Sequence, residues 1–263
     1  MNFYKSLFGE FLGTLILTFV GCSTVALAVI YGVFPNIIPI ALIWGLGVTI
    51  AIYATKGYSK SHLNPAVSAA FYRMKEISFQ QLLGFWIAQL AGGITAGLLV
   101  YLVFNDGIAQ FELNNGIIRG DDQSFVSASI FGEFFPNPGY ISEIPTLSLL
   151  SAVIYEALGT FCLMTGILII ISLEKLSKWA PILIGLLVAS LIMWLAPFTQ
   201  CGMNPARDFG PRLVAFCSGW GDAAFPKIEY SFLSVYIVAP IVGGVSAALI
   251  FNILKSKFRV TKN

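Results

Sequence analysis

The chain has 263 residues, of which 57% are hydrophobic and 11% are charged, and its formal net charge at pH 7 is +2. This composition excludes an ordinary soluble domain, in which about a quarter of the residues are charged, and the small net charge does not indicate nucleic-acid binding. Apolar runs long enough to cross a bilayer, which takes about 20 residues, lie near 9–31, 37–55, 79–104, 147–173, 180–197 and 231–253. The sequence therefore predicts an all-α membrane protein with six spans.

Basic residues gather in alternate connections and at both termini, whereas the stretch 105–146 is acidic. Positive charge marks the cytoplasmic side, so we expect both termini in the cytoplasm. We also expect the chain in the plasma (cytoplasmic) membrane. The first apolar run leads directly into further spans without a small-residue cleavage site, so we expect no cleaved leader. The basic residues concerned are Lys5, Lys56, Lys60, Arg73, Lys75, Lys175, Lys178, Lys255, Lys257, Arg259 and Lys262.

The cysteines indicate neither a metal site nor a disulfide framework. Cys22, Cys162, Cys201 and Cys217 are scattered through apolar surroundings without metal-ligand spacing. We expect Cys22 and Cys162 to be buried thiols. We expect no cofactor, and no set of nucleophile, base and metal indicates an enzyme.

The chain consists of two related halves. "GEFLGT" at 9–14 recurs as "YEALGT" at 155–160, and each copy is followed by one more span and then by Asn-Pro-Ala. Three spans per half mean that the second half enters the membrane from the opposite side, a layout common in transport proteins. We expect a single channel domain over 1–263, with inverted repeats at about 1–104 and 147–255 and a linker at 105–146.

Each Asn-Pro-Ala motif predicts the start of a short helix, because proline is favoured at the first helical position and asparagine just before it. The helical stretches run to Met74 and to about Cys217, and at 1.5 Å per residue they cover about half of a bilayer core. Two half-helices entering from opposite faces bring their N-termini together near the midplane. The motif residues are Asn64, Pro65, Ala66, Asn204, Pro205 and Ala206.

The chemistry of this meeting point suits neutral polar solutes. An asparagine oxygen caps backbone N–H groups while its NH₂ group still offers donors, and each helix N-terminus carries about half a positive charge. Such a site repels cations and disfavours a proton-conducting chain of water. It predicts a passive channel, although an ion- or proton-coupled secondary transporter also uses inverted repeats and broken helices.

Together with "AQLAGG" at 88–93 and "NPARDFGP" at 204–211, these motifs resemble the aquaporin (major intrinsic protein) family. "WGLGV" at 44–48, "FPNP" at 135–138 and "GWGDAAF" at 219–225 are similar to its glycerol facilitator branch. The resemblance implies a right-handed bundle of six transmembrane helices plus two re-entrant half-helices, one pore per subunit and a homotetramer. It implies passage of glycerol, water and other small neutral solutes such as urea or hydrogen peroxide, with protons and ions excluded. A structural junction protein with the same fold is the remaining alternative.

The resemblance also implies a selectivity filter. Arg207, on the same helical face as Asn204, is the expected filter cation, and Trp44 is expected to pack the carbon edge of a polyol. The other two positions depart from the glycerol facilitators: Cys201 stands where they carry an aromatic residue, and Ile192 stands where they carry glycine. The filter is therefore expected to be a hybrid that favours small amphiphilic solutes.

Further roles are carried over from the same resemblance. We expect His62 to line the cytoplasmic vestibule, with pH gating as the alternative. Glu10 and Glu156 are expected to accept from loop N–H groups, with a proton relay as the alternative. We expect Asp208 to stabilise a helix start and to pair with Arg212. A ladder of acceptors is expected from the backbone carbonyls of Ser61, His62, Leu63, Gln200, Cys201 and Gly202.

Overall fold

The computed structural model describes residues 2–228 and 230–260, and Lys262, one of the basic residues expected in the cytoplasm, lies outside this part of the chain. Within it, six helices are long and apolar enough to cross a membrane, as predicted. They are α1 (Phe3–Tyr31), α2 (Ile37–Thr55), α4 (Phe79–Asn114), α6 (Leu149–Ser172), α8 (Ala180–Thr199) and the span Leu233–Lys255, in which the π-helix η5 (Leu233–Val238) continues into α10 (Ala239–Val260).

Two shorter helices, α3 (Pro65–Arg73) and α9 (Pro205–Ala215), begin at the Asn-Pro-Ala motifs, so the fold is the predicted one of six spans and two half-helices. The described residues contain no strand. The remaining helical turns are α5 (Phe125–Ala128), α7 (Glu174–Ser177), η1 (Asp122–Ser124), η2 (Pro138–Tyr140), η3 (Phe216–Trp220) and η4 (Gly221–Ala224).

Polar residues set most of the helix boundaries. The side chains of Asn2, Asn36 and Ser148 accept bonds from backbone N–H groups in the first turns of α1, α2 and α6. At α4, Ser78 and Gln81 cap each other's backbone N–H groups reciprocally. These caps supply the partners that the first N–H groups of a helix lack.

The packing of the spans repeats in the two halves and exchanges elements between them. Helix α1 packs on α4 in the first half, and α6 packs on α10 in the second half. Each half-helix packs on the last span of the other half, α3 on α10 and α9 on α4. Helices α2 and α8 cross at Gly45 and Gly185, where a Cβ on either residue would meet the carbonyl of the other.

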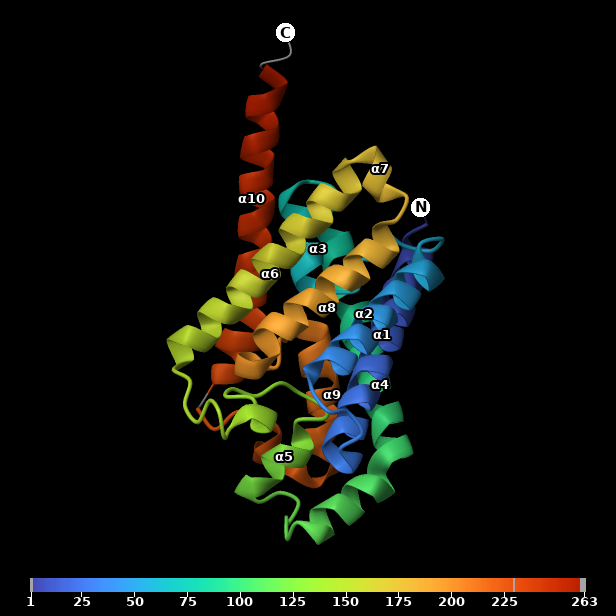
Figure 1. Ribbon diagram of the computed structural model, residues 1–263. Coiled ribbons are helices and arrows are strands. Elements are labelled where there is room, and N and C mark those ends of the chain that lie inside the picture. The colour runs from blue at the N-terminus through green and yellow to red at the C-terminus, as the bar shows by residue number, and fades with distance from the viewer. Residues whose placement is uncertain (1, 229, 261–263) are drawn as a thin grey trace.

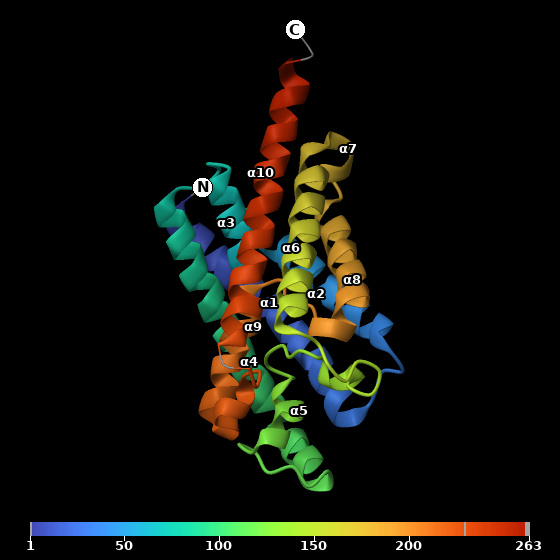
Figure 2. The same cartoon turned by 90° about the vertical axis from the view of Figure 1, so that its left-hand side faces the viewer.

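The two ends of the bundle differ, as Figures 1 and 2 show. Both chain termini and α7 lie at one end, which we call the terminal end, and α10 extends well beyond its neighbours there. The connection between α4 and α6, with α5 in it, covers the opposite end, which we call the linker end.

Two helix ends differ from the predicted positions. Helix α4 continues past residue 104 to Asn114, because the first strong break is Asn115-Gly116, with Gly116 at a φ of 64°. Helix α9 stops at Ala215, and the chain then continues into η3, which is kinked at Gly219, where φ is 105°. The first part of the stretch 105–146 is therefore the polar end of a spanning helix.

A fully buried arginine ties the linker to the second half-helix. Arg212 forms an ion pair with Asp208, four residues earlier on α9, at 2.6 Å, and both side chains are fully buried. The same guanidinium donates to the carbonyl oxygens of Glu133 in the linker and Ala224 in η4. Asp208 in turn accepts from the backbone N–H of Glu133 at 2.7 Å. These bonds fix the linker over α9.

We predict that Asp208→Asn lowers the free energy of unfolding by about 3–5 kcal/mol, because it leaves the Arg212 charge buried without its partner. Unfolding in detergent, titrated with sodium dodecyl sulfate and followed by circular dichroism, measures the change. Asp122→Asn is the matched control, since the Asp122–Lys227 ion pair is exposed and such pairs contribute little. Equal stability of the two variants would contradict the prediction.

Candidate functional site: a pore through the bundle

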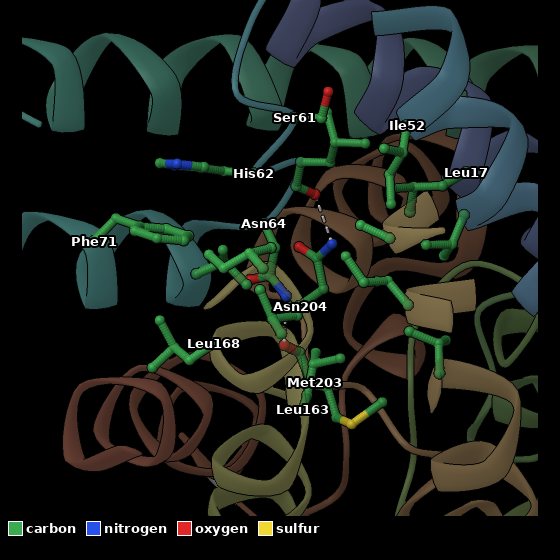
Figure 3. Close-up of a pocket in the computed structure, with 18 of the residues that line it drawn as sticks. Leu17, Ile52, Ser61, His62, Asn64, Phe71, Leu163, Leu168, Met203 and Asn204 are labelled. Carbon is green, nitrogen blue, oxygen red and sulfur yellow. Dashed lines mark hydrogen bonds between the residues drawn. The ribbon is translucent and has the colours of Figure 1, made fainter. Parts of the chain in front are cut away.

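The two half-helices meet through their asparagines. Asn64 Oδ1 accepts from the N–H of Ala66 at 2.8 Å, and Asn204 Oδ1 accepts from the N–H of Ala206 at 3.1 Å, so each side chain caps its own helix. Each NH₂ group then donates across to the opposite loop: Asn64 to the Met203 carbonyl at 2.8 Å and Asn204 to the carbonyl of Leu63 at 2.9 Å. Figure 3 shows the two amides side by side where the loops meet. We call this pair of bonds the asparagine cross-brace.

The loop before the first half-helix has an unusual backbone that a buried carboxylate supports. Ser61 and Leu63 adopt positive φ angles of 52° and 53°, a conformation that costs L-residues free energy and persists where the surroundings enforce it. Glu10, on α1, accepts from the N–H groups of His62 and Leu63 at 3.0 and 2.6 Å, and Gln89 of α4 donates to the same carboxylate.

The second loop repeats this arrangement. Cys201 and Met203, at the equivalent positions, have φ angles of 66° and 48°. Glu156, on α6, accepts from the N–H groups of Gly202 and Met203 at 2.8 and 2.7 Å and from the hydroxyl of Thr199 at 2.6 Å. The contacts expected for Glu10 and Glu156 are thus present, and both carboxylates are used in holding the loops.

Two cavities lead from the ends of the bundle toward the cross-brace. The terminal cavity, about 430 Å³, is lined by Lys60 and Lys255 at its mouth and by His62, Asn64 and Asn204 deeper inside. The linker cavity, about 550 Å³, opens at the linker end. Four residues line both cavities, and we call them the shared ring: Trp44, Ile192, Gln200 and Arg207.

Arg207 is held from two sides within this ring. Its guanidinium lies over the Trp44 ring at 4.4 Å from the centroid, a cation–π contact. It also forms an ion pair with Glu133 of the linker, and both side chains are buried. Arg207 Nη1 has no hydrogen-bond partner among the described residues. This nitrogen is itself buried, so the structure leaves one guanidinium donor without a partner beside the junction of the cavities.

Cys201 lies beside the shared ring. Of the two cavities it lines only the terminal one, and the residue is 5% exposed. Its neighbour Gln200 occupies the ring and accepts from the Phe134 N–H at 2.7 Å, which ties the ring to the linker. A reagent from the linker end therefore reaches Cys201 only after passing the ring.

The imidazole of His62 lies in the wall of the terminal cavity. It stacks on Phe71, with ring centroids 4.5 Å apart, and meets Phe85 edge-on. Its Nδ1 lies 3.2 Å from Ser68 Oγ, and its Nε2 has no partner within the described part of the chain. The side chain points away from the cross-brace toward Phe71 (Figure 3).

The rim of the linker cavity carries polar groups. Asn137 donates to the Ala196 carbonyl at 2.6 Å and so joins the rim to α8. Partial burial raises the pKa of the Tyr140 phenol, and the Glu143 carboxylate raises it further. The phenol is therefore a neutral hydrogen-bonding group at neutral pH. No group of three His, Cys, Asp or Glu side chains that could hold a metal ion occurs in residues 2–228 and 230–260.

The family model of the major intrinsic proteins matches residues 1–251 of this chain. The chain belongs to the major intrinsic protein family. It is 38% identical to the glycerol uptake facilitator protein of Pseudomonas aeruginosa, over 95% of this chain and 89% of the relative. It is 35% identical to the propanediol uptake facilitator of Citrobacter freundii, over 94% and 91% respectively. The aquaglyceroporin structure from Plasmodium falciparum shares the fold, with a TM-score of 0.80 at 24% identity over 95% of this chain and 96% of that chain.

In this major intrinsic protein, sequence reasoning missed two residues at the junction of the cavities. Glu133 was recognised only as part of an acidic linker, and its spacing from Arg207 gives no signal of the ion pair. Gln200 was expected to contribute its carbonyl alone, whereas the residue also lines the shared ring. An acidic residue directly before the aromatic pair of "EFFPNP" is the one signal that could have indicated Glu133.

We predict that Glu133→Gln and Arg207→Val change ion exclusion in opposite directions. Glu133→Gln leaves the positive charge of Arg207 uncompensated, so we expect the anion leak to rise by about tenfold or more while cations stay excluded. Arg207→Val leaves the negative charge of Glu133 uncompensated, so we expect cations to leak instead. The Glu133 backbone keeps its own bonds to Asp208 and Arg212, so we expect the linker to stay in place. Currents across planar bilayers in asymmetric salt distinguish the ions. Cation leak through Glu133→Gln would show that the pair does not set the charge of the junction.

Proposed function

We propose that the chain forms a passive transmembrane channel for glycerol, water and other small neutral solutes. The observation that carries this proposal is the meeting of the two cavities at one ring of side chains, beside two half-helix N-termini joined by the asparagine cross-brace. A broken backbone at membrane depth is tolerated where it lines a wet cavity. The names of the relatives, facilitators of glycerol and propanediol uptake, support the same class of solute.

The shared ring is proposed as the selectivity filter, together with Cys201 beside it. Trp44 and Ile192 offer an apolar wall, and Arg207, which lines both cavities, offers a guanidinium with N–H donors. This asymmetry suits a solute with carbon atoms on one edge and hydroxyls on the other. The backbone carbonyls of the two loops are proposed as acceptors along the path, with His62 lining it on the terminal side.

We expected Arg207 to act as the filter cation, but the charges at the junction support a different source for the barrier to cations. Glu133 compensates the charge of Arg207, so the arginine does not act there as a lone cation. The two helix N-termini at Pro65 and Pro205 keep their partial positive charges, and we propose that these supply the barrier to cations. Small neutral solutes such as urea and hydrogen peroxide would not meet this barrier.

We further propose a multi-pass protein of the plasma membrane that forms a homotetramer, with a single channel domain in each subunit. The basic residues at the terminal end support a cytoplasmic position for both termini. The proposed activity is transport and not catalysis. A coupled secondary transporter is the competing function, but both buried carboxylates of the repeats, Glu10 and Glu156, are engaged by loop N–H groups and so are not free to carry protons.

We predict that the purified protein in liposomes raises glycerol and water permeability without a proton current. Stopped-flow light scattering with a panel of glycerol, propanediol, urea and other neutral solutes measures the flux, and a pH-sensitive dye inside the vesicles measures protons. Protein-free liposomes are the control. Flux that needs an ion gradient, or proton conductance comparable to solute flux, would contradict a passive channel.

We predict that Hg²⁺ blocks the channel by binding Cys201, because this thiol lies in the wall of the terminal cavity beside the ring. Cys201→Ser should conduct and lose the block, whereas Cys22→Ser and Cys162→Ser should keep both conduction and block. Cys217→Ser is the control for an exposed thiol outside both cavities. Glycerol flux before and after mercury treatment measures the effect, and block that survives in Cys201→Ser would remove this residue from the pore wall.

A further inference from the structure

Helix α1 presents one row of side chains to the pore, and the row has a gap. Leu17 lines the terminal cavity, and Val25 and Val29 line the linker cavity. Val25 and Val29 are four apart and Leu17 and Val25 are eight apart, so they follow one another along a row of positions spaced by four. Gly21 is the member of the row between Leu17 and Val25, so α1 presents no side chain at the height where the two cavities meet.

The indole of Trp44 fills this gap. A Cβ built on Gly21 would lie closer than 3.0 Å to three carbons of the six-membered ring of Trp44, a separation that real Cβ atoms do not show. The ring edge thus rests directly on the α1 backbone. Any side chain at position 21 must push the indole away from α1, toward the pore that the indole lines.

The indole has little freedom to move without changing the ring. Its aromatic ring lies under the Arg207 guanidinium at 4.4 Å, and Arg207 is itself paired with Glu133. Displacement of Trp44 therefore narrows the opening or moves the guanidinium that lines both cavities. Both changes hinder a polyol more than they hinder water, which is smaller and needs no carbon-facing wall.

We infer that Gly21 is a specificity-determining positioning residue: its lack of a side chain sets how far Trp44 protrudes into the pore and thereby which solutes pass. This inference rests on the proposed channel function and on the assignment of the shared ring as its filter. Gly21 acts through Trp44 and does not itself touch the solute.

The test compares glycerol and water permeability of liposomes containing four channels: the unmodified protein, Gly21→Ala, Trp44→Phe and the double variant. Gly21→Ala should lower the ratio of glycerol to water permeability by about tenfold, at the low end of what one methylene does to discrimination in a tight pocket. In the double variant the shorter phenyl ring leaves room for the methyl group, so its ratio should equal that of Trp44→Phe. Gly166→Ala is the matched control, because its Cβ would meet Leu187, and neither residue lines the terminal cavity or the linker cavity.

The outcomes separate this inference from the function on which it rests. No solute flux through the unmodified protein would overturn the proposed channel itself. If Trp44→Phe changes the ratio but Gly21→Ala does not, the filter stands and the role of Gly21 is overturned. The inference also fails if the double variant has a lower ratio of glycerol to water permeability than Trp44→Phe alone. It fails as well if Gly166→Ala lowers this ratio as much as Gly21→Ala does. If Gly21→Ala does not accumulate in the membrane while the double variant does, Gly21 has only a packing role.

Discussion

The rest of the structure depends on the asparagine cross-brace. Two helix N-termini, each with a partial positive charge, repel one another when they meet in a medium of low dielectric constant. Asn64 and Asn204 overcome this by capping their own helices and donating to the opposite loops. Aspartate could make the cap but has no donor for the cross-bond, and leucine could make neither. Asparagine is therefore required at both positions by the same pair of bonds.

Around this centre, the inverted repeat supplies a nearly symmetric frame, and the linker supplies the asymmetry. Glu10 and Glu156 hold equivalent loops by equivalent bonds, and each half-helix packs on the last span of the other half. Glu133, by contrast, has no counterpart in either repeat. It comes from the linker and reaches the arginine at the junction of the cavities, so the charge of the shared ring is set by a segment outside the symmetric frame.

The sequence predicts the features that depend on local patterns. The length of the apolar runs predicts the spans: 37–55 matches α2 (Ile37–Thr55), and 147–173 lies close to α6 (Leu149–Ser172). The Asn-Pro-Ala motifs predict where α3 and α9 begin. The end of α4 was misplaced because polarity marks where a helix leaves the membrane and not where its hydrogen bonds stop.

Side-chain contacts between distant segments could not be predicted in the same way. The Glu133–Arg207 ion pair joins residues with no fixed spacing, and the place of Gly21 beneath Trp44 depends on how α1 and α2 pack. Glycines in a membrane helix indicate close approach, but their pattern does not say which side chain fills the space. The roles of the ring residues in selecting a solute stay predictions.

The exchange of half-helices between the repeats has a consequence for the order in which the protein can be made. Helix α3 belongs to the first half, yet it packs on α10, the last span to leave the ribosome, and its cap donates to a carbonyl at Met203. Until then the Asn64 NH₂ group and the Leu63 carbonyl lack their partners in the second loop, although Glu10 of α1 can already accept from the N–H groups of the first loop. The contacts of α3 with α10 and with the second loop can therefore form only after most of the chain has been synthesised. The centre of the pore is completed as a late step of assembly.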